Sequence, residues 1–306
     1  PILASRQVPE SLLKLFKAMP RWTPAMDALR TSVSVLSHFD QDVSDNSREA
    51  NLRKAERLLS QIPLVVADHH RISNGQTPIA PREDLSHCAN FLNMVLGEEP
   101  KEEATKALDV SLILYAEHEF NASTFTSRVI CSTESDLHSS IVGAIGALKG
   151  RLHGGANEKV VDILKEAGGP DTAEKWVRDA FAKKERIMGF GHRVYKSGDV
   201  RARILKKYAT EAAEAVGKSE WEETAAIIEQ IMADEKKLHP NLDWPAGRLY
   251  YCLGLDIPLY TPIFVMSRVT GWCAHVIEQL ENNRLIRPRA RYTGPETRPV
   301  PDMADR

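Results

Sequence analysis

The sequence has little net charge and no long apolar run. Its 40 Lys and Arg residues nearly balance 42 Asp and Glu residues, which leaves a formal net charge of −2 over 306 residues. No overall field therefore favours nucleic acid or an anionic membrane surface. The most apolar stretch, residues 257–266, is short and is interrupted by Pro258 and Pro262, so it cannot span a bilayer. We expect neither a nucleic-acid nor a membrane partner.

The cysteine patterns of disulfide frameworks and metal sites are also absent. Four cysteines lie far apart, with no CxxC pair: Cys88, Cys131, Cys252 and Cys273. Such spacing is typical of buried thiols in a reducing compartment, and no signal peptide opens the chain. We therefore expect a cytoplasmic protein. His118 and Glu119 begin like the zinc motif HExxH, but Ala122 stands where the second histidine belongs, so we predict no metal site.

The motifs of several large enzyme classes are missing as well. The sequence contains no GxxxxGK[ST], which argues against a P-loop, and no GxSxG, which argues against an α/β-hydrolase nucleophile. The loop that begins at Gly189 has two glycines of GxGxxG but lacks the third, and no clear strand precedes it. A dinucleotide-binding fold is therefore not favoured.

Helical periodicity, by contrast, runs through most of the chain. Apolar residues recur at helical spacing over residues 11–19, 103–117, 137–149, 157–167 and 263–280. Strand patterns are few, so we predict an all-α protein. We interpret Gly168-Gly169-Pro170 as a helix stop, and Asp171 with Glu174 and Ser219 with Glu222 as capping boxes. With 42% hydrophobic residues, the length suggests about two domains, interleaved because no linker is visible.

The first of three notable loops is Leu152-His153-Gly154-Gly155-Ala156-Asn157, just ahead of a predicted helix. A helix N-terminus disfavours imidazolium, so His153 would stay neutral and could donate a hydrogen bond to a developing oxyanion. The alternative is a structural histidine that caps a turn.

The second loop surrounds His192 and is rich in glycines and cations. Gly189 and Gly191 would let backbone N–H groups approach a ligand. Arg193, Lys196 and Arg201 could bind phosphate or carboxylate, although a basic solvated turn explains the same residues.

The third loop places Asp243 between two prolines and beside Trp244. Desolvation by the indole could raise the carboxylate's basicity towards that of a general base, although a helix cap is the alternative. Farther along, Arg268 lies inside an apolar run. A buried arginine needs an anionic partner, which is either a structural acid or a bound carboxylate.

Seven segments follow one another in an order that resembles the citrate synthase family from Met26 to Pro295. They are HEFNASTFTSR, ALKG, LHGGAN, GFGHRVY, PNLD, TPIFVMSR and RLIRPRARYTGP. The resemblance implies an all-α, citrate synthase-like fold with a cleft between a large domain, residues 1–153 and 251–306, and a small domain, residues 154–250. It also implies a homodimer without a cofactor, acting in the tricarboxylic acid cycle.

The resemblance also implies a role for each motif residue. His153 would bind the thioester carbonyl of acetyl-CoA, Asp243 would remove a methyl proton, and His192 would polarise the ketone of oxaloacetate. The dicarboxylate ligands would be His118, Arg201 and Arg268. Arg287 would reach the partner subunit's site, and coenzyme A would lie near Lys196, Gly189 and Gly191.

The sequence departs from the family pattern at several places. A further N-terminal segment with an RGY-type motif is expected ahead of Pro1, and Val200 and Arg151 each replace a proline. The segment Leu242-Asp243-Trp244 also occurs in 2-methylcitrate synthases, which use propionyl-CoA. We therefore expect a citrate synthase first, and a 2-methylcitrate synthase or a dual-activity enzyme second. A catalytically inactive helical interaction protein is the alternative from another class.

Overall fold

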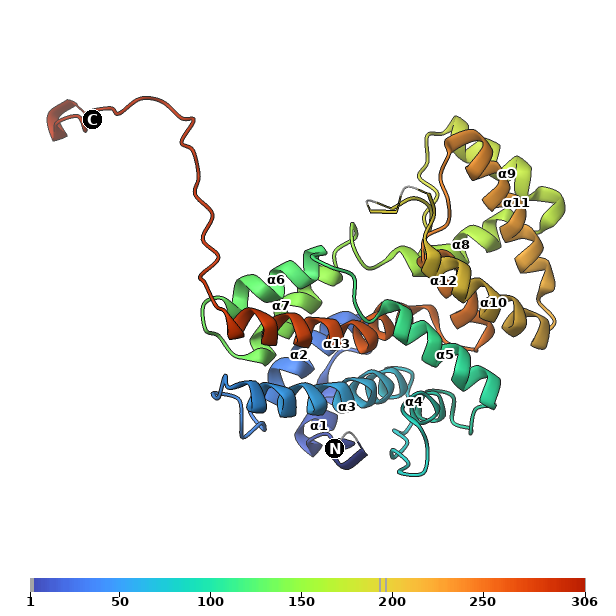
Figure 1. Cartoon of the computed structure of the whole chain (residues 1–306), viewed down its shortest axis with the longest axis horizontal. Coiled ribbons are helices and arrows are strands. Elements are labelled where there is room, and N and C mark those ends of the chain that lie inside the picture. The colour runs from blue at the N-terminus through green and yellow to red at the C-terminus, as the bar shows by residue number, and fades with distance from the viewer. Residues whose placement is uncertain (1–2, 193, 196, 306) are drawn as a thin grey trace.

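The computed structural model describes residues 3–192, 194–195 and 197–305, and it is all-α as predicted (Figure 1). Its helices are α1 (Glu10–Ala18), α2 (Ala25–Ser37), α3 (Arg48–Ser73), α4 (His87–Leu96), α5 (Glu102–Tyr115), α6 (Ala122–Cys131), α7 (Leu137–Leu148), α8 (Ala156–Ala167), α9 (Pro170–Ala182), α10 (Val200–Ala215), α11 (Ser219–Lys236), α12 (Asp243–Cys252) and α13 (Tyr260–Glu281). Three short 3-10 turns lie at Leu3–Ser5, Ile257–Leu259 and Met303–Asp305. Within the described ranges, the β pairing is an isolated bridge between Phe190 and Pro240.

All five periodic segments form helices close to their predicted bounds. Residues on their predicted apolar faces, such as Leu12, Ile141 and Val161, are fully buried. All four cysteines are buried free thiols, also as predicted. The apolar stripes therefore identify both the helices and the faces that they bury.

Two predicted helix caps are wrong. Gly168 ends α8 in a left-handed conformation, with φ +78°, as predicted. Pro170, in contrast, is the first residue of α9 and is not part of the break between the two helices. Proline is tolerated in the first turn of a helix because its missing N–H would have no partner there. Asp171 therefore lies inside the first turn, and Ser219 is likewise the first residue of α11 without capping it through its side chain.

The apolar side chains form two cores. The larger core is built from α1–α7 and α13, and it also takes in one face of α10 and of α12. The smaller core joins α8, α9 and α11 to Phe190 and Trp244. In Figure 1, α8–α12 stand together beside the body that contains the remaining helices. We propose that this division corresponds to the predicted large domain, 1–153 with 251–306, and small domain, 154–250.

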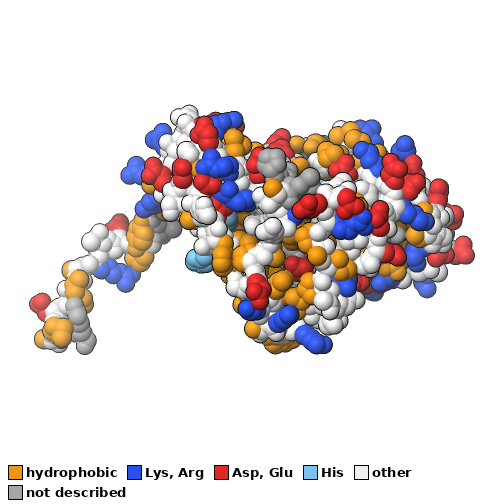
Figure 2. Space-filling model, turned by 90° about the horizontal axis from the view of Figure 1, so that it is seen from below, with side chains coloured by type: hydrophobic (Ala, Val, Ile, Leu, Met, Phe, Trp, Pro, Cys, Tyr) orange, Lys and Arg blue, Asp and Glu red, His pale blue; other side chains and the backbone are white. Residues whose placement is uncertain are grey.

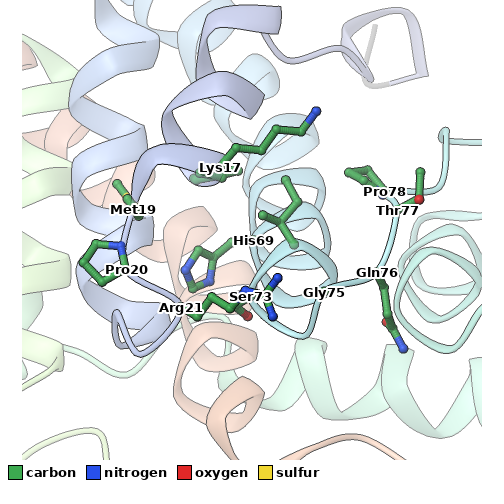
Figure 3. A pocket seen from close by; sticks show the side chains of 12 residues that line it. Lys17, Met19, Pro20, Arg21, His69, Ser73, Gly75, Gln76, Thr77 and Pro78 are labelled. Atoms are coloured by element: carbon green, nitrogen blue, oxygen red, sulfur yellow. The ribbon is translucent and has the colours of Figure 1, made fainter.

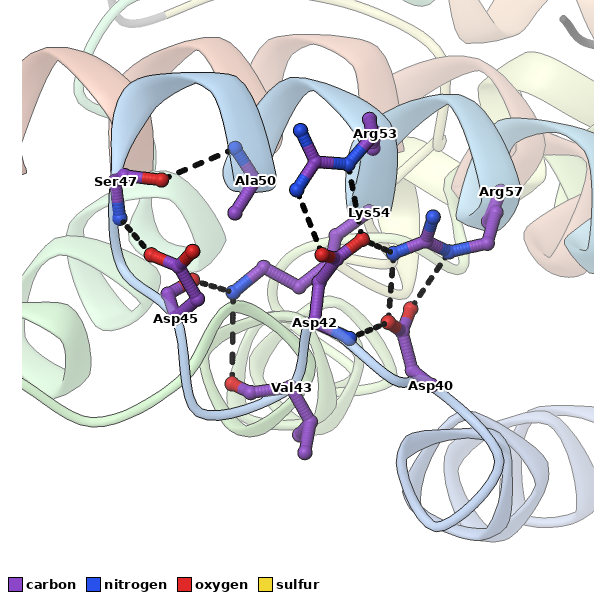
Figure 4. A network of polar contacts seen from close by, with 9 residues as sticks. All are labelled: Asp40, Asp42, Val43, Asp45, Ser47, Ala50, Arg53, Lys54 and Arg57. Carbon is purple, nitrogen blue, oxygen red and sulfur yellow. Dashed lines mark hydrogen bonds and ion pairs between the residues drawn. The ribbon is translucent and has the colours of Figure 1, made fainter.

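The connection between α2 and α3 is fixed by a polar network, shown in Figure 4. Arg57 Nη2 lies 2.6 Å from a carboxylate oxygen of Asp40 and 2.6 Å from one of Asp42. Lys54 is completely buried, and its ammonium donates to the backbone oxygen of Asp45 at 2.6 Å. Residues 40–48, whose polarity suggests an exposed loop, are thus tied to α3, the long helix that packs against α13.

The surface is mixed in charge. Figure 2 shows positive and negative side chains interspersed over the face seen from below, in agreement with the small net charge. No helix in the part of the chain that the structure describes is long and apolar enough to cross a bilayer. The segment after α13 extends away from the body (Figures 1 and 2).

Candidate active site

The second and third loops of the sequence lie side by side. The N–H of Gly191 donates to the carbonyl of His239 at 2.8 Å, and the N–H of Asn241 donates to that of Gly189 at 2.9 Å. The side chain of Asn241 donates to the carbonyl of Gly191 and accepts from the N–H of Asp243, both at 3.0 Å. These bonds join the His192 loop to the start of α12.

The glycines of this loop are required by its packing. Gly189 and Gly191 have φ +89° and +75°, which favour glycine. A Cβ on Gly189 would lie 2.9 Å from Cε3 of Trp244. Their predicted contact with coenzyme A stays a prediction, and Lys196, predicted for the same ligand, lies outside the described residues.

His153 lies three residues ahead of Ala156, the first residue of α8. The backbone N–H of Ser123 donates to its Nε2 at 3.3 Å, and the hydroxyl of Ser123 lies 2.8 Å from the same nitrogen. Because a backbone N–H can only donate, we assign the proton of the neutral ring to Nδ1. Burial and, after it, the positive charge of Arg268 lower the pKa of His153 to about 4. The ring is therefore neutral near pH 7, as predicted, with burial as the main cause.

His192 is held in the opposite tautomer. The backbone N–H groups of Val194 and Tyr195 donate to its Nδ1 at 3.0 and 3.3 Å, so the neutral ring carries its proton on Nε2. Its ring packs edge to face on His118, with 4.8 Å between centroids. The structure thus brings His192 and His118 together.

His118 presents a buried nitrogen that lacks a partner. Its Nε2 has no hydrogen-bond partner among the described residues. Burial, followed by the charge of Arg201, lowers the pKa of His118. Buried polar atoms are nearly always paired in folded proteins, so an unpaired one is a candidate ligand contact.

Asp243 is the first residue of α12 and is partly buried. Its Oδ1 accepts a hydrogen bond of 2.6 Å from the hydroxyl of Tyr115. Burial raises the pKa of Asp243, and the bond from Tyr115 and the charge of Arg201 act against this increase. The direction of this pKa shift agrees with the sequence prediction. The Trp244 ring packs in a tilted arrangement on Phe190, with 4.6 Å between centroids.

Arg268 is 2% exposed, as its apolar surroundings predict. Its Nε donates to the carbonyl of Tyr115 at 2.6 Å. Within the described ranges, Glu117 and Asp243 act on its guanidinium as charges but form no ion pair with it. Burial and the charge of Arg201 lower the pKa of Arg268 to about 10. The sequence left two kinds of anionic partner open for Arg268, a structural acid and a bound carboxylate. Among the described residues, no structural acid forms an ion pair with it.

Arg201, in contrast, is held by a buried carboxylate. Its Nε and Nη2 donate to Asp199 at 3.0 and 2.8 Å, and Asp199 also accepts from the N–H of Leu242 at 3.2 Å. Asp199 is the N-cap of α10, so it joins the starts of α10 and α12. The sequence analysis missed Asp199, although an Asp just ahead of a helix is a recognisable cap.

Phe264 and Tyr115 are also missing from the predicted site. The Phe264 ring lies 4.4 Å from that of Tyr115 and 6.4 Å from that of His153, between centroids. The guanidinium carbon of Arg268 lies 4.8 Å from the same ring. Phe264 thus connects His153 to the pair of Tyr115 and Asp243. In the sequence both residues look like ordinary members of an apolar helix face.

Arg287 lies outside this cluster. It is exposed in the extended segment that follows α13, and its Nη1 donates to the carbonyl of Pro288 at 3.3 Å. The sequence prediction concerns the site of a partner subunit, and it stays a prediction.

A hollow with a volume of about 280 Å³ lies between the end of α1 and the end of α3 (Figure 3). Lys17, Arg21 and His69 line it, and it contains none of the predicted site residues. No group of three or more His, Cys, Asp or Glu within the described ranges is arranged to hold a metal ion.

Comparisons with known proteins identify the family. The family model described as citrate synthase, C-terminal domain, matches residues 2–289. Citrate synthase 2 of Bacillus subtilis (strain 168) is 49% identical over 290 residues, 94% of this chain and 78% of that protein. A 2-methylcitrate synthase of Mycobacterium tuberculosis is 46% identical over 298 residues, 97% of this chain and 75% of that protein.

A solved structure gives the same result. The ternary complex of carboxymethyl coenzyme A and oxaloacetate with citrate synthase from Thermoplasma acidophilum superposes with a TM-score of 0.92 at 32% identity. The match covers 100% of this chain and 82% of that one. Sequence, fold and enzyme type therefore agree: the chain belongs to the citrate synthase family of acyltransferases.

Proposed function

We propose that the chain condenses acetyl-CoA with oxaloacetate and then hydrolyses the thioester, which gives citrate and free coenzyme A. One observation carries this proposal. Backbone N–H groups donate to Nε2 of His153 and to Nδ1 of His192, so the opposite nitrogen of each ring is the one that would carry the proton directed at a substrate oxygen. Asp243 is connected to the same cluster through Tyr115 and Phe264.

The first step makes a carbon nucleophile. The methyl group next to a thioester carbonyl is a very weak acid, so a base and an oxyanion donor have to act together. Asp243 accepts the methyl proton, and the C–H electron pair becomes the double bond of the enol. His153 Nδ1–H donates to the thioester oxygen, where negative charge develops.

The second step forms the carbon–carbon bond. The enol carbon attacks the ketone carbon of oxaloacetate, and His192 Nε2–H supplies a proton to the ketone oxygen. Arg268, Arg201 and the unpaired Nε2 of His118 bind the two carboxylates of oxaloacetate. The buried charge of Arg268, which forms no ion pair with a described carboxylate, supports this role.

The third step releases coenzyme A. Water adds to the thioester carbonyl of the condensation product, the C–S bond breaks, and coenzyme A leaves as the thiol. Closure of the proposed small domain on the large domain would exclude bulk water until condensation is complete. No step requires a cofactor.

A second activity would differ from the first only in the acyl group of the coenzyme A substrate. Relatives with the names citrate synthase and 2-methylcitrate synthase are 49% and 46% identical to this chain. One additional methylene is worth only about 1 to 3 kcal/mol in an apolar pocket. Propionyl-CoA is therefore the second candidate substrate, with 2-methylcitrate as the product.

We further propose a homodimer in which Arg287 of each chain contacts the oxaloacetate bound by the partner subunit. Coenzyme A would contact the loop that contains Gly189, Gly191 and Lys196. Arg287 is exposed at the start of the extended segment that follows α13, and the backbone N–H of Ile286 beside it donates to Ser132 Oγ at 3.1 Å. This exposure supports a contact with another copy.

The test is release of coenzyme A thiol from oxaloacetate with either acetyl-CoA or propionyl-CoA. We expect activity with both, and the ratio of the two kcat/KM values identifies the preferred acyl group. The Asp243→Ala variant serves as the control without the base. Absence of thiol release with both substrates from folded protein would contradict the proposal.

A further inference from the structure

Tyr115 ends α5 and contacts the candidate base and a candidate substrate ligand at the same time. Its hydroxyl donates to Asp243 Oδ1 at 2.6 Å. Its backbone oxygen, one of the unpaired carbonyls at the end of a helix, accepts from Arg268 Nε at 2.6 Å. One residue thus connects the carboxylate that removes a proton to the guanidinium that binds oxaloacetate.

The hydroxyl of Tyr115 remains a donor throughout the physiological pH range. The side chain is 2% exposed, and burial followed by the charge of Asp243 raises the pKa of Tyr115 well above its usual range. Its ring is packed against Phe264 with 4.4 Å between centroids, which restricts its position. The hydrogen bond to Asp243 is therefore constant in both direction and geometry.

We propose that Tyr115 is a positioning residue for Asp243, which it orients so that Oδ2 receives the substrate proton. This inference rests on the proposed function. The hydrogen bond occupies Oδ1, whereas no described group donates to Oδ2. The same bond favours the ionised carboxylate in a buried site, where desolvation favours the protonated acid.

Several other charged groups also act on Asp243. Arg201 on α10 and Arg268 on α13 favour its ionised form, and Asp199 disfavours it. These three charges remain when Tyr115 is replaced by Phe. Loss of the hydroxyl alone therefore isolates the contribution of the hydrogen bond.

The chain contains a matched control between the same two helices. Tyr250 on α12 is fully buried, and its hydroxyl lies 2.7 Å from the hydroxyl of Ser111 on α5. Tyr115→Phe and Tyr250→Phe each remove one buried hydroxyl between α5 and α12. Only the first removes a hydrogen bond to Asp243.

The experiment compares these two variants with the wild type in turnover of acetyl-CoA and oxaloacetate. For Tyr115→Phe we expect kcat to fall roughly 10- to 100-fold, as for loss of a hydrogen bond to a charged group. The acid limb of the kcat/KM profile should move to higher pH, and the isotope effect with trideuterated acetyl-CoA should rise. The KM for oxaloacetate should not change, because the backbone oxygen that holds Arg268 is retained.

Tyr250→Phe should keep the wild-type pH profile and isotope effect. A wild-type pH profile in Tyr115→Phe would overturn the inference, even if kcat is lower.

A measurement that does not depend on turnover distinguishes failure of this inference from failure of the proposed function. Carbon-13 NMR of labelled aspartate, assigned with Asp243→Asn, should show Asp243 titrating at higher pH in Tyr115→Phe. An inactive wild type would contradict the proposed function, whereas an unchanged titration would contradict the role of Tyr115.

Discussion

Two arginines buried to nearly the same degree differ in their partners. Arg248, on α12, is 1% exposed and pairs with Glu222 on α11, with Nε 2.7 Å from a carboxylate oxygen. Arg268, on α13, is 2% exposed and has no described carboxylate at this distance. After burial, the charge of Arg201, which carries the same sign, has the largest effect and lowers the pKa of Arg268 further, whereas the charge of Glu117 raises it.

We propose that the difference distinguishes a structural region from a ligand-binding region. The charge of Arg248 is paired with a carboxylate within the fold. The guanidinium of Arg268 and the Nε2 of His118, which has no partner among the described residues, are instead the groups that a bound anion would pair. We therefore take buried groups without a partner, and not buried ion pairs, as the indication of a ligand site. The following substitutions test this distinction between Arg268 and Arg248.

The largest effect is expected at the base. Replacing Asp243 with Asn should lower kcat by roughly 10²- to 10⁴-fold, because general base catalysis contributes about that factor. Asp42→Asn, in the polar network of α2 and α3, serves as the matched control and should leave kcat unchanged. The comparison uses coenzyme A release at saturating substrates, and equal kcat values for the two variants would be inconsistent with the assignment.

The next largest effect is expected on oxaloacetate binding, in which the two arginines should differ. Arg268→Met should raise the KM for oxaloacetate by about 100-fold, because charge-assisted hydrogen bonds to a carboxylate are lost. Its free energy of unfolding should stay within about 1 kcal/mol of the wild type. Steady-state kinetics and chemical unfolding measure the two quantities. A large loss of stability with an unchanged KM would assign Arg268 a structural role instead.

Arg248→Met should show the reverse pattern. Removing one partner of a buried ion pair leaves Glu222 uncompensated, which costs about 3 to 5 kcal/mol of stability. The KM for oxaloacetate of the folded fraction should stay close to that of the wild type. Unfolding in denaturant gives the first value and kinetics at low temperature give the second. If Arg248→Met were as stable as the wild type, the structural role of Arg248, and with it the contrast between the two arginines, would be contradicted.

The smallest effect concerns pH. His153 has its pKa lowered to about 4 in the folded state, so the unfolded chain binds more protons between about pH 4 and pH 6.5. The contribution of His153 to stability is therefore complete above pH 6.5 and is lost as the pH falls towards 4. In His153→Gln, the melting temperature should depend less on pH over this window. An identical dependence in both proteins would argue against a neutral, buried His153.

The sequence predicted the helices well because their apolar periodicity is regular, as in α7 and α13. It also identified His153, His192, Asp243 and Arg268 as polar residues in unusual surroundings. The caps near Pro170 and Ser219 failed because the same residue types occur at a helix stop, at a start and inside a first turn.

Tyr115, Phe264 and Asp199 could not be predicted as site residues. Tyr115 and Phe264 belong to apolar faces of α5 and α13. Their contacts join positions more than 100 residues apart in sequence, as in the bonds that Tyr115 makes with Asp243 and Arg268. Asp199 is visible as a helix cap, but its bond to the N–H of Leu242 depends on how two loops pack together. Tertiary contacts of this kind carry no local pattern.

The most direct test of the distinction between the two arginines is the change in melting temperature that oxaloacetate causes. A ligand that binds only the folded state stabilises it by RT ln(1 + [L]/Kd) and so raises the melting temperature more when its Kd is lower. We predict an increase for the wild type, an increase from a lower starting value for Arg248→Met, and no increase for Arg268→Met at the same concentration. An increase in Arg268→Met equal to that of the wild type would contradict the account.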